Sequence, residues 1–172
     1  PSFFTGVTTI VLKLFQCVEP KVAIFGKKDY QQLLIIKQMC SQFFINTKII
    51  AAETVRDKDG LALSSRNSYL DKERRGKAPL LYSFLTSASE YLRNLYRRKR
   101  LNSKALLEVE INTKQGLQKK GWKIDYIKIC KQNDLNTPTD IELRNGVNIV
   151  ILAAGWLGST RLIDNLEITW TN

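Results

Sequence analysis

Two short apolar runs on either side of one amphipathic stretch constrain the fold most. Residues 22–25 form a continuous apolar run that ends at Gly26, and residues 47–55 form a second run. Such runs are typical of strands in a parallel sheet. Asp29 is a plausible N-cap for the stretch between them, which has apolar residues at helical spacing. The pattern predicts a βαβ unit with a right-handed crossover, preceded by a helix over 6–16.

After residue 67 the pattern changes to helices followed by strands. Asp71 can cap a helix over 71–97, in which Pro79 sits early, and a second helix is expected over 103–119. A linker around 136–140 separates strand candidates, which lie at 123–131, within 145–158 and at 161–168. This order is typical of a small α+β domain. We therefore expect three segments: 1–57 in an α/β domain, 58–70 as a loop and hinge, and 71–172 in the α+β domain.

The composition excludes several classes of protein. The 172 residues contain no apolar run of the roughly 18 residues that a membrane helix needs. Three distant cysteines, Cys17, Cys40 and Cys130, argue against a disulfide framework and favour a reducing cytoplasm. There is no histidine, so no histidine of this chain can act as a base or a metal ligand.

The net charge of +11 favours an anionic partner: nucleic acid, an acidic membrane or a phosphorylated small molecule. The densest basic run, residues 97–100, reads as a solvated helix end. Tyr91, Tyr96 and Trp122 could stack on bases, so a basic nucleic-acid-binding module is one alternative. The basic residues are dispersed and no recognised nucleic-acid motif is present, so we expect no nucleic-acid and no membrane partner.

The first candidate site follows the first strand. Gly26 lets a ligand approach the backbone, Lys28 offers a charge for a phosphate, and Gln32 lies about one helical turn further on. In open α/β sheets, ligands bind at the carboxyl ends of the strands. The alternative interpretation is an ordinary surface turn with solvated lysines.

The second candidate site is the stretch Leu63-Ser64-Ser65-Arg66-Asn67, which follows the second strand. Two hydroxyls and a guanidinium suit phosphate oxygens. The alternative is a serine- and asparagine-rich turn leading into the next helix. Taken together, the two motifs are expected to face one triphosphate, although neither a GxxxxGK[ST] nor a GxGxxG motif is present.

Four stretches carry a specific resemblance, and their order and spacing match as well. They are FTGVTTIVLKLF (4–15), FGKKDYQQL (25–33), TVRDKDGLALSSRNSYL (54–70) and GSTRLIDN (158–165). The chain resembles the C-terminal part of the pantothenate synthetases, the pantoate–β-alanine ligase family.

The resemblance implies a fold and a reaction. The fold would be α/β: part of a Rossmann-like nucleotidyltransferase (HUP-type) domain, followed by a small α+β C-terminal domain that closes over the site. Pantoate and ATP would give pantoyl adenylate and pyrophosphate, and β-alanine would then displace AMP. Mg²⁺ would accompany the ATP, with no metal ligand from this chain. The full-length protein would be a cytoplasmic homodimer.

The resemblance also implies roles for individual residues. Lys28, Ser64, Ser65 and Arg66 would be catalytic. ATP would be bound by Gly26, Lys27, Lys28, Asp29, Val55, Leu63, Ser64, Ser65 and Arg66. Pantoate would be bound by Gln32, Val7, Ile10 and Val11.

Three residues depart from the family's pattern. Phe3 stands where a histidine is usual, Lys27 where a glutamate is usual, and Glu53 where a proline is usual. The family's N-terminal half, with its His-x-Gly-His-type motif, has no counterpart in the sequence. We therefore expect these 172 residues to be inactive or nearly so by themselves. A non-catalytic or degenerate relative is the second alternative.

Overall fold

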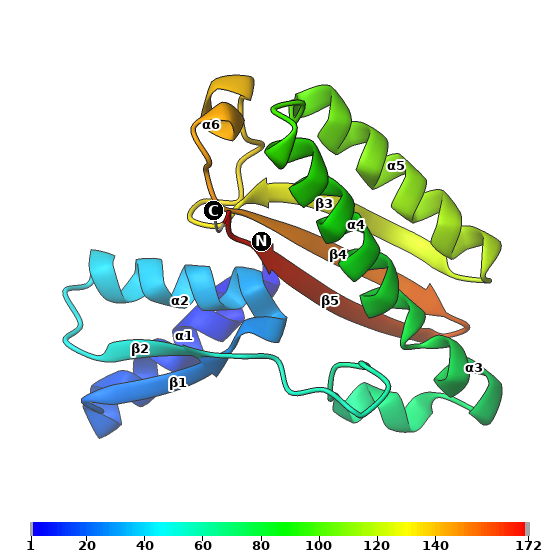
Figure 1. Ribbon diagram of the computed structural model, residues 1–172. Coiled ribbons are helices and arrows are strands. Elements are labelled where there is room, and N and C mark those ends of the chain that lie inside the picture. Colours follow the sequence, from blue (N-terminus) through cyan, green and yellow to red (C-terminus); the bar gives the residue numbers. More distant parts are fainter. Residues whose placement is uncertain (1, 171–172) are drawn as a thin grey trace. The chain divides into compact units, whose positions relative to one another are not determined.

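The computed structural model describes residues 2–170. The chain divides into two compact units, Pro1–Thr54 and Val55–Asn172, and each is described by itself (Figure 1). No helix within the described part of the chain is long and apolar enough to cross a membrane.

The first unit contains the predicted βαβ arrangement. Helix α1 (Ser2–Val18) precedes strand β1 (Val22–Gly26), and a 3₁₀ turn η1 (Lys27–Asp29) leads into helix α2 (Tyr30–Gln42). Strand β2 (Lys48–Ala52) then pairs with β1 in parallel, in a register that runs from Val22 opposite Lys48 to Gly26 opposite Ala52. The carboxyl ends of the two strands are therefore neighbours, as the sequence predicts.

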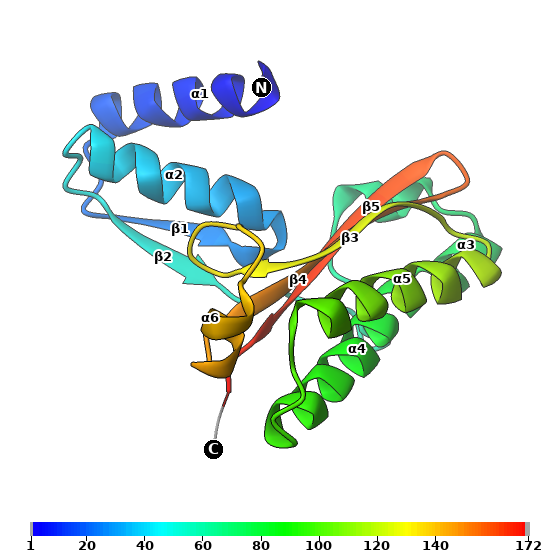
Figure 2. The same cartoon turned by 90° about the horizontal axis from the view of Figure 1, so that it is seen from above.

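Both helices of this unit pack on one face of the two strands. The buried cluster joins Phe15 of α1 to Ile36, Met39 and Cys40 of α2. Figure 2 shows α1 and α2 on the same side of the sheet. Only alternate strand residues pack against the cluster, namely Ala23, Phe25 and Ile49. The other face carries exposed Val22, Ile24 and Ile50, so α1 and α2 cover one face of these strands and leave the apolar residues of the other exposed.

The second unit is the predicted α+β domain. Its antiparallel sheet has the order β3-β4-β5, and two long helices lie on one face of it (Figure 1). The strands are β3 (Lys123–Lys131), β4 (Ile149–Leu157) and β5 (Thr160–Ile168), and the helices are α3 (Lys72–Lys77), α4 (Leu80–Arg97), α5 (Ser103–Lys119) and α6 (Asp140–Arg144), with a 3₁₀ turn η2 (Ser65–Tyr69). The apolar side of α4 packs with α5 and the sheet in one continuous core.

Two elements differ from expectation. The predicted helix over 71–97 is two helices, because Pro79 has no N–H for the helical ladder and its ring obstructs the preceding turn. Asp71 does cap the first of them, since its carboxylate accepts a hydrogen bond from the Arg74 N–H at 2.8 Å. The expected linker leads into the unpredicted helix α6, which Thr139 and Glu142 stabilise through a capping box.

Candidate active site

The motif after β1 occupies the carboxyl edge of the parallel pair. Gly26 is the last residue of β1, Lys27–Asp29 form η1, and α2 begins at Tyr30. Asp29 is the N-cap residue of α2, as expected, but its side chain makes no capping hydrogen bond. The backbone N–H groups at the N-terminus of α2 are therefore not capped by the Asp29 side chain, and such groups favour anions.

Lys27 and Glu53, two of the three residues that depart from the family's pattern, form an ion pair. The Lys27 Nζ lies 2.5 Å from Glu53 Oε1. The strand register explains the contact, because each residue directly follows one of the partners Gly26 and Ala52. The Glu53 side chain is 82% exposed. The positive charge that Lys27 adds to this edge is therefore offset by a solvent-accessible carboxylate.

The residues expected to contact pantoate lie on two helices of this unit. Gln32 is half-buried in the first turn of α2. Val7, Ile10 and Val11 share one side of α1 because their spacing is i, i+3, i+4. Val11 packs against the buried cluster, whereas Ile10 is exposed. Their role as a substrate wall stays a prediction.

In the second unit, a tight turn brings Val55 and Leu63 together. The Leu63 N–H donates to the Val55 carbonyl at 2.9 Å, and the Asp57 N–H donates to the Leu61 carbonyl at 2.8 Å. Gly60 has φ +92, and a Cβ on it would lie 3.0 Å from the Tyr82 ring. A glycine is therefore required at this corner. Val55 and Leu63, both expected to bind ATP, are thus adjacent.

The SSRN stretch is more regular than expected. It forms the 3₁₀ turn η2, and the Ser64 hydroxyl caps it by accepting a hydrogen bond from the Arg66 N–H at 3.2 Å. The Asn67 amide donates to the Ala62 carbonyl at 3.1 Å, which ties η2 back to the preceding turn. Ser65 and Arg66 are exposed, and Arg66 has no ion-pair partner between residues 2 and 170. A hydroxyl and a guanidinium therefore remain accessible to an anion.

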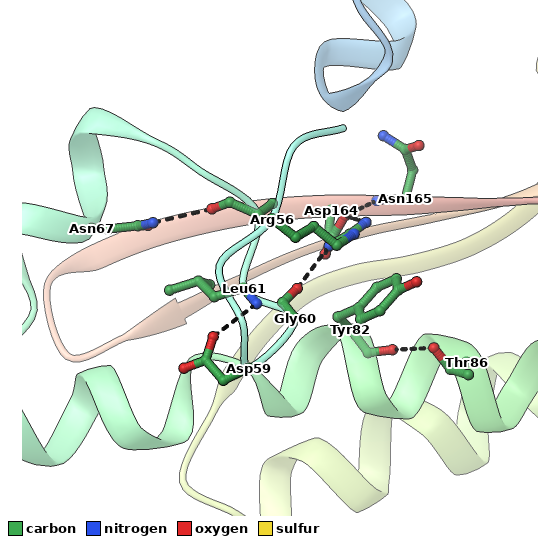
Figure 3. Close-up of polar contacts among 10 residues, drawn as sticks. Arg56, Asp59, Gly60, Leu61, Asn67, Tyr82, Thr86, Asp164 and Asn165 are labelled. Carbon is green, nitrogen blue, oxygen red and sulfur yellow. Dashed lines mark hydrogen bonds and ion pairs between the residues drawn. The ribbon is translucent and has the colours of Figure 1, made fainter. Parts of the chain in front are cut away.

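Five further ionic residues support this turn, and the sequence analysis assigned none of them a role. Arg56 forms a bidentate ion pair with Asp164 of β5, with N–O distances of 2.7 and 2.8 Å (Figure 3). The guanidinium of Arg75, in α3, donates hydrogen bonds to the carboxylates of Asp57 at 2.8 Å and Asp59 at 2.6 Å. The hydrogen bond from Arg75 lowers the pKa of Asp59. Alternating charges at 56–59 hint at such pairs, but nothing local in the sequence points to Asp164.

The structure also bears on the nucleic-acid alternative. Trp122 is buried in the core of the second unit, and Tyr96 stacks on Trp170 with ring centroids 4.3 Å apart. Of the three aromatic side chains considered for base stacking, Tyr91 alone is largely exposed. This arrangement weakens the case for a nucleic-acid-binding module.

The chemistry that both motifs offer is recognition of phosphate oxygens. Cations, hydroxyls and helical N–H groups stabilise negative charge on transferring or leaving phosphates. No group of three or more His, Cys, Asp or Glu side chains that could hold a metal ion lies within the described residues. The expectation that the two motifs face one triphosphate stays a prediction.

Known proteins match this chain in sequence and in structure. Residues 1–167 match the protein family described as pantoate–beta-alanine ligase. A crystal structure of the pantothenate synthetase from Thermus thermophilus is 36% identical, with a TM-score of 0.78, and the match covers 94% of this chain and 54% of that one. The pantoate–beta-alanine ligase from Francisella tularensis, crystallised with "Beta-gamma ATP and Beta-alanine", is 34% identical, with a TM-score of 0.67 and coverage of 96% and 51%.

The chain thus spans about half the length of the solved structures that it matches. The predicted fold class, a parallel α/β part followed by an antiparallel α+β part, is confirmed by this likeness. The resemblance seen in the four sequence stretches is confirmed as well. The chain belongs to the pantoate–beta-alanine ligase family.

Proposed function

We propose that this chain is part of an enzyme that joins pantoate and β-alanine to form pantothenate at the expense of ATP. The observation that carries the proposal is family membership over residues 1–167. The Francisella tularensis relative, whose crystals contain an ATP species and β-alanine, supports the choice of substrates. The alternative is a degenerate relative that has kept the fold and lost the reaction.

The proposed reaction has two steps. A carboxylate oxygen of pantoate attacks the α-phosphorus of ATP, the bond to the β-phosphate oxygen breaks, and pyrophosphate leaves. The amine of β-alanine then attacks the acyl carbon of pantoyl adenylate, releases AMP and loses a proton. Both steps depend on alignment of the reactants and on stabilisation of phosphate charge more than on an acid or a base.

We assign the phosphate contacts to Lys28 and Arg66 and to the hydroxyls of Ser64 and Ser65. Two observations support this assignment: Lys28 lies at the carboxyl edge of β1, and Arg66 is exposed within the capped 3₁₀ turn η2. Further proposed ATP contacts are Gly26, Lys27, Asp29, Val55 and Leu63, and proposed pantoate contacts are Gln32, Val7, Ile10 and Val11. Mg²⁺ would enter with the phosphates of ATP, and we assign no residue of this chain as its ligand.

Pantoate-dependent exchange of labelled pyrophosphate into ATP tests the adenylate step. The test protein, called the joined protein below, is this chain fused to the part of the Thermus thermophilus relative that the match does not cover. We expect exchange that needs pantoate but not β-alanine, and a loss of at least about a hundredfold in Arg66→Ala. Arg98→Ala, which removes an exposed arginine from the basic run, is the matched control and should exchange normally. A folded protein that forms no labelled ATP would support the degenerate alternative.

The organisation of the enzyme is also part of the proposal. Residues 1–57 would belong to the nucleotide-binding domain, 58–70 would form the ATP-contacting loop and hinge, and 71–172 would form a lid. We propose a cytoplasmic homodimer for the longer protein. Cys17, Cys40 and Cys130 are all free thiols, in keeping with a reducing compartment. Light scattering on the joined protein would measure its oligomeric state.

A further inference from the structure

The Arg56–Asp164 pair is more buried and better aligned than an ion pair between solvent-exposed side chains. The Asp164 side chain is 4% exposed and that of Arg56 is 17% exposed. Arg56 Nη1 donates to Asp164 Oδ2 and Nη2 donates to Oδ1, and the guanidinium carbon lies 3.6 Å from the centroid of the Tyr82 ring. Paired, hydrogen-bonded charges in such a site hold one geometry, because breaking the pair leaves a buried charge without compensation.

The same guanidinium also fixes the turn itself. Arg56 Nη1 donates to the Gly60 carbonyl at 3.1 Å (Figure 3). Asp164, at the other end of the pair, sits opposite Ala153 inside the β4–β5 ladder. The ion pair therefore connects the corner of a surface turn to the middle of a strand that pairs with β4 along its length.

From the turn, hydrogen bonds continue to the proposed ATP loop. Arg56 and Ala62 form an isolated β-bridge, the Leu63 N–H binds the Val55 carbonyl, and the Asn67 amide binds the Ala62 carbonyl. Residues 63–66 are thus held at both ends by groups that Arg56 positions. A displaced Arg56 would release both ends together.

We propose that Arg56 and Asp164 are positioning residues that fix residues 63–66 for the phosphates of ATP. Neither residue touches the nucleotide in this proposal; they act through the turn. The inference rests on the proposed function for its ligand. Its structural part, the control of the loop by Asp164, can be measured without any ligand.

The test compares Asp164→Asn with Lys131→Gln in the joined protein. Asp164→Asn keeps the size of the side chain and removes the charge. Lys131→Gln also breaks ion pairs, those of Lys131 with Asp134 and Glu142. Lys131, however, lies on β3, away from Asp164. Lys131 pairs with Ile149, whose other partner is Ile168, four residues along β5 from Asp164. Lys131→Gln therefore controls for a general loss of stability.

Two readouts are measured at temperatures equally far below each variant's own melting point. In Asp164→Asn, we expect the amides of residues 57, 60 and 63 to exchange hydrogen about tenfold faster than in the wild type. We also expect MgATP to bind about tenfold more weakly. Lys131→Gln should change neither readout. If Asp164→Asn fails to fold, Arg56→Met/Asp164→Leu replaces it, since replacing both charges by apolar groups is often neutral for stability.

The outcomes separate this inference from the proposed function. A wild-type protein that does not bind MgATP would contradict the proposed function and the positioning role together. A wild type that binds, with a variant that binds equally well or keeps its loop amides protected, would overturn the positioning role alone. Faster exchange together with weaker binding, absent from Lys131→Gln, is the result that the inference requires.

Discussion

At the scale of single residues, the charge balance at the end of β1 depends on one contact. Lys27 and Glu53 are 26 positions apart, yet the parallel register places them side by side. Each residue alone departs from the family's pattern, but the opposite charges of the two side chains offset each other. The sequence identifies both departures, but only the strand register reveals that they are partners.

Removing the negative partner should strengthen nucleotide binding. Glu53→Gln removes one negative charge beside Lys27, near the proposed phosphate site. Over roughly 8 Å of water, one unit charge is worth about 0.5 kcal/mol, so MgATP should bind about two- to threefold more tightly. Titration calorimetry at low and high salt measures the change, which should shrink at high salt. Glu19→Gln, before the other end of β1, is the control, and equal or weaker binding in Glu53→Gln would contradict the prediction.

At the scale of elements, the strands and helix α5 were predictable from their apolar patterns, whereas helix α6 and the division of the helix expected over 71–97 were not. Helix α5 lies where its apolar spacing predicts it, and the three strands of the second unit contain the expected residues. The register shift between Ile124 and Tyr126 in β3 was not predicted. Helix α6 has five residues, too few for a helical period to be recognised. The regular turn at 55–63 depends on Arg75 and Asp164, which lie far along the chain.

The turn at Gly60 gives a prediction on stability with a built-in comparison. Gly60→Ala forces a side chain into φ +92 beside the Tyr82 ring, so it should lower the free energy of unfolding by about 1–2 kcal/mol. Gly76→Ala makes the same chemical change in α3, where a Cβ would meet nothing within 4 Å. That variant should be neutral or up to about 1 kcal/mol more stable. Urea unfolding distinguishes the two, and equal effects would contradict the account of the turn.

Helix α6 gives a prediction on pH. A hydrogen bond from Lys131, followed by those from Thr139, lowers the pKa of Glu142 from 4.5 to about 2. Folding therefore favours the ionised carboxylate: its contribution is complete above pH 4.5 and is lost as the pH falls towards 2.

The unfolding free energies of the wild type and Glu142→Gln should therefore differ at pH 7 and converge near pH 2. Urea unfolding at a series of pH values measures the difference. Glu108→Gln, which removes an exposed carboxylate of α5, is the control. A difference that stays constant with pH would contradict the assigned cause.

At the scale of the whole molecule, the two units have very different cores. The main cluster of the second unit contains 21 buried apolar residues, whereas that of the first contains four. The fold class could be predicted because each unit has its own pattern: strand–helix–strand in the first, helices and then strands in the second. The exposed strand face of the first unit could not be predicted, because an apolar run does not show how many faces are covered.

The unequal cores predict two steps of unfolding. The first unit should unfold at a lower urea concentration than the second, because less apolar surface is buried in it. Amide exchange followed along a urea series would show residues 22–52 opening before residues 123–168. A separate chain of residues 55–172 should unfold at the midpoint of the second step. A single transition shared by all amides would contradict this prediction.

Contact of residues 26–29 and of residues 63–66 with the phosphates of ATP is the core of the proposed function. The most direct measurement is a MgATP titration of the joined protein, followed by its backbone amide shifts. We expect saturable amide shifts clustered at residues 26–29 and 63–66. These shifts should be strongly reduced in Arg66→Ala and unchanged in Arg98→Ala. Shifts at neither stretch in a folded protein, or shifts centred on the basic run at 97–100, would contradict it.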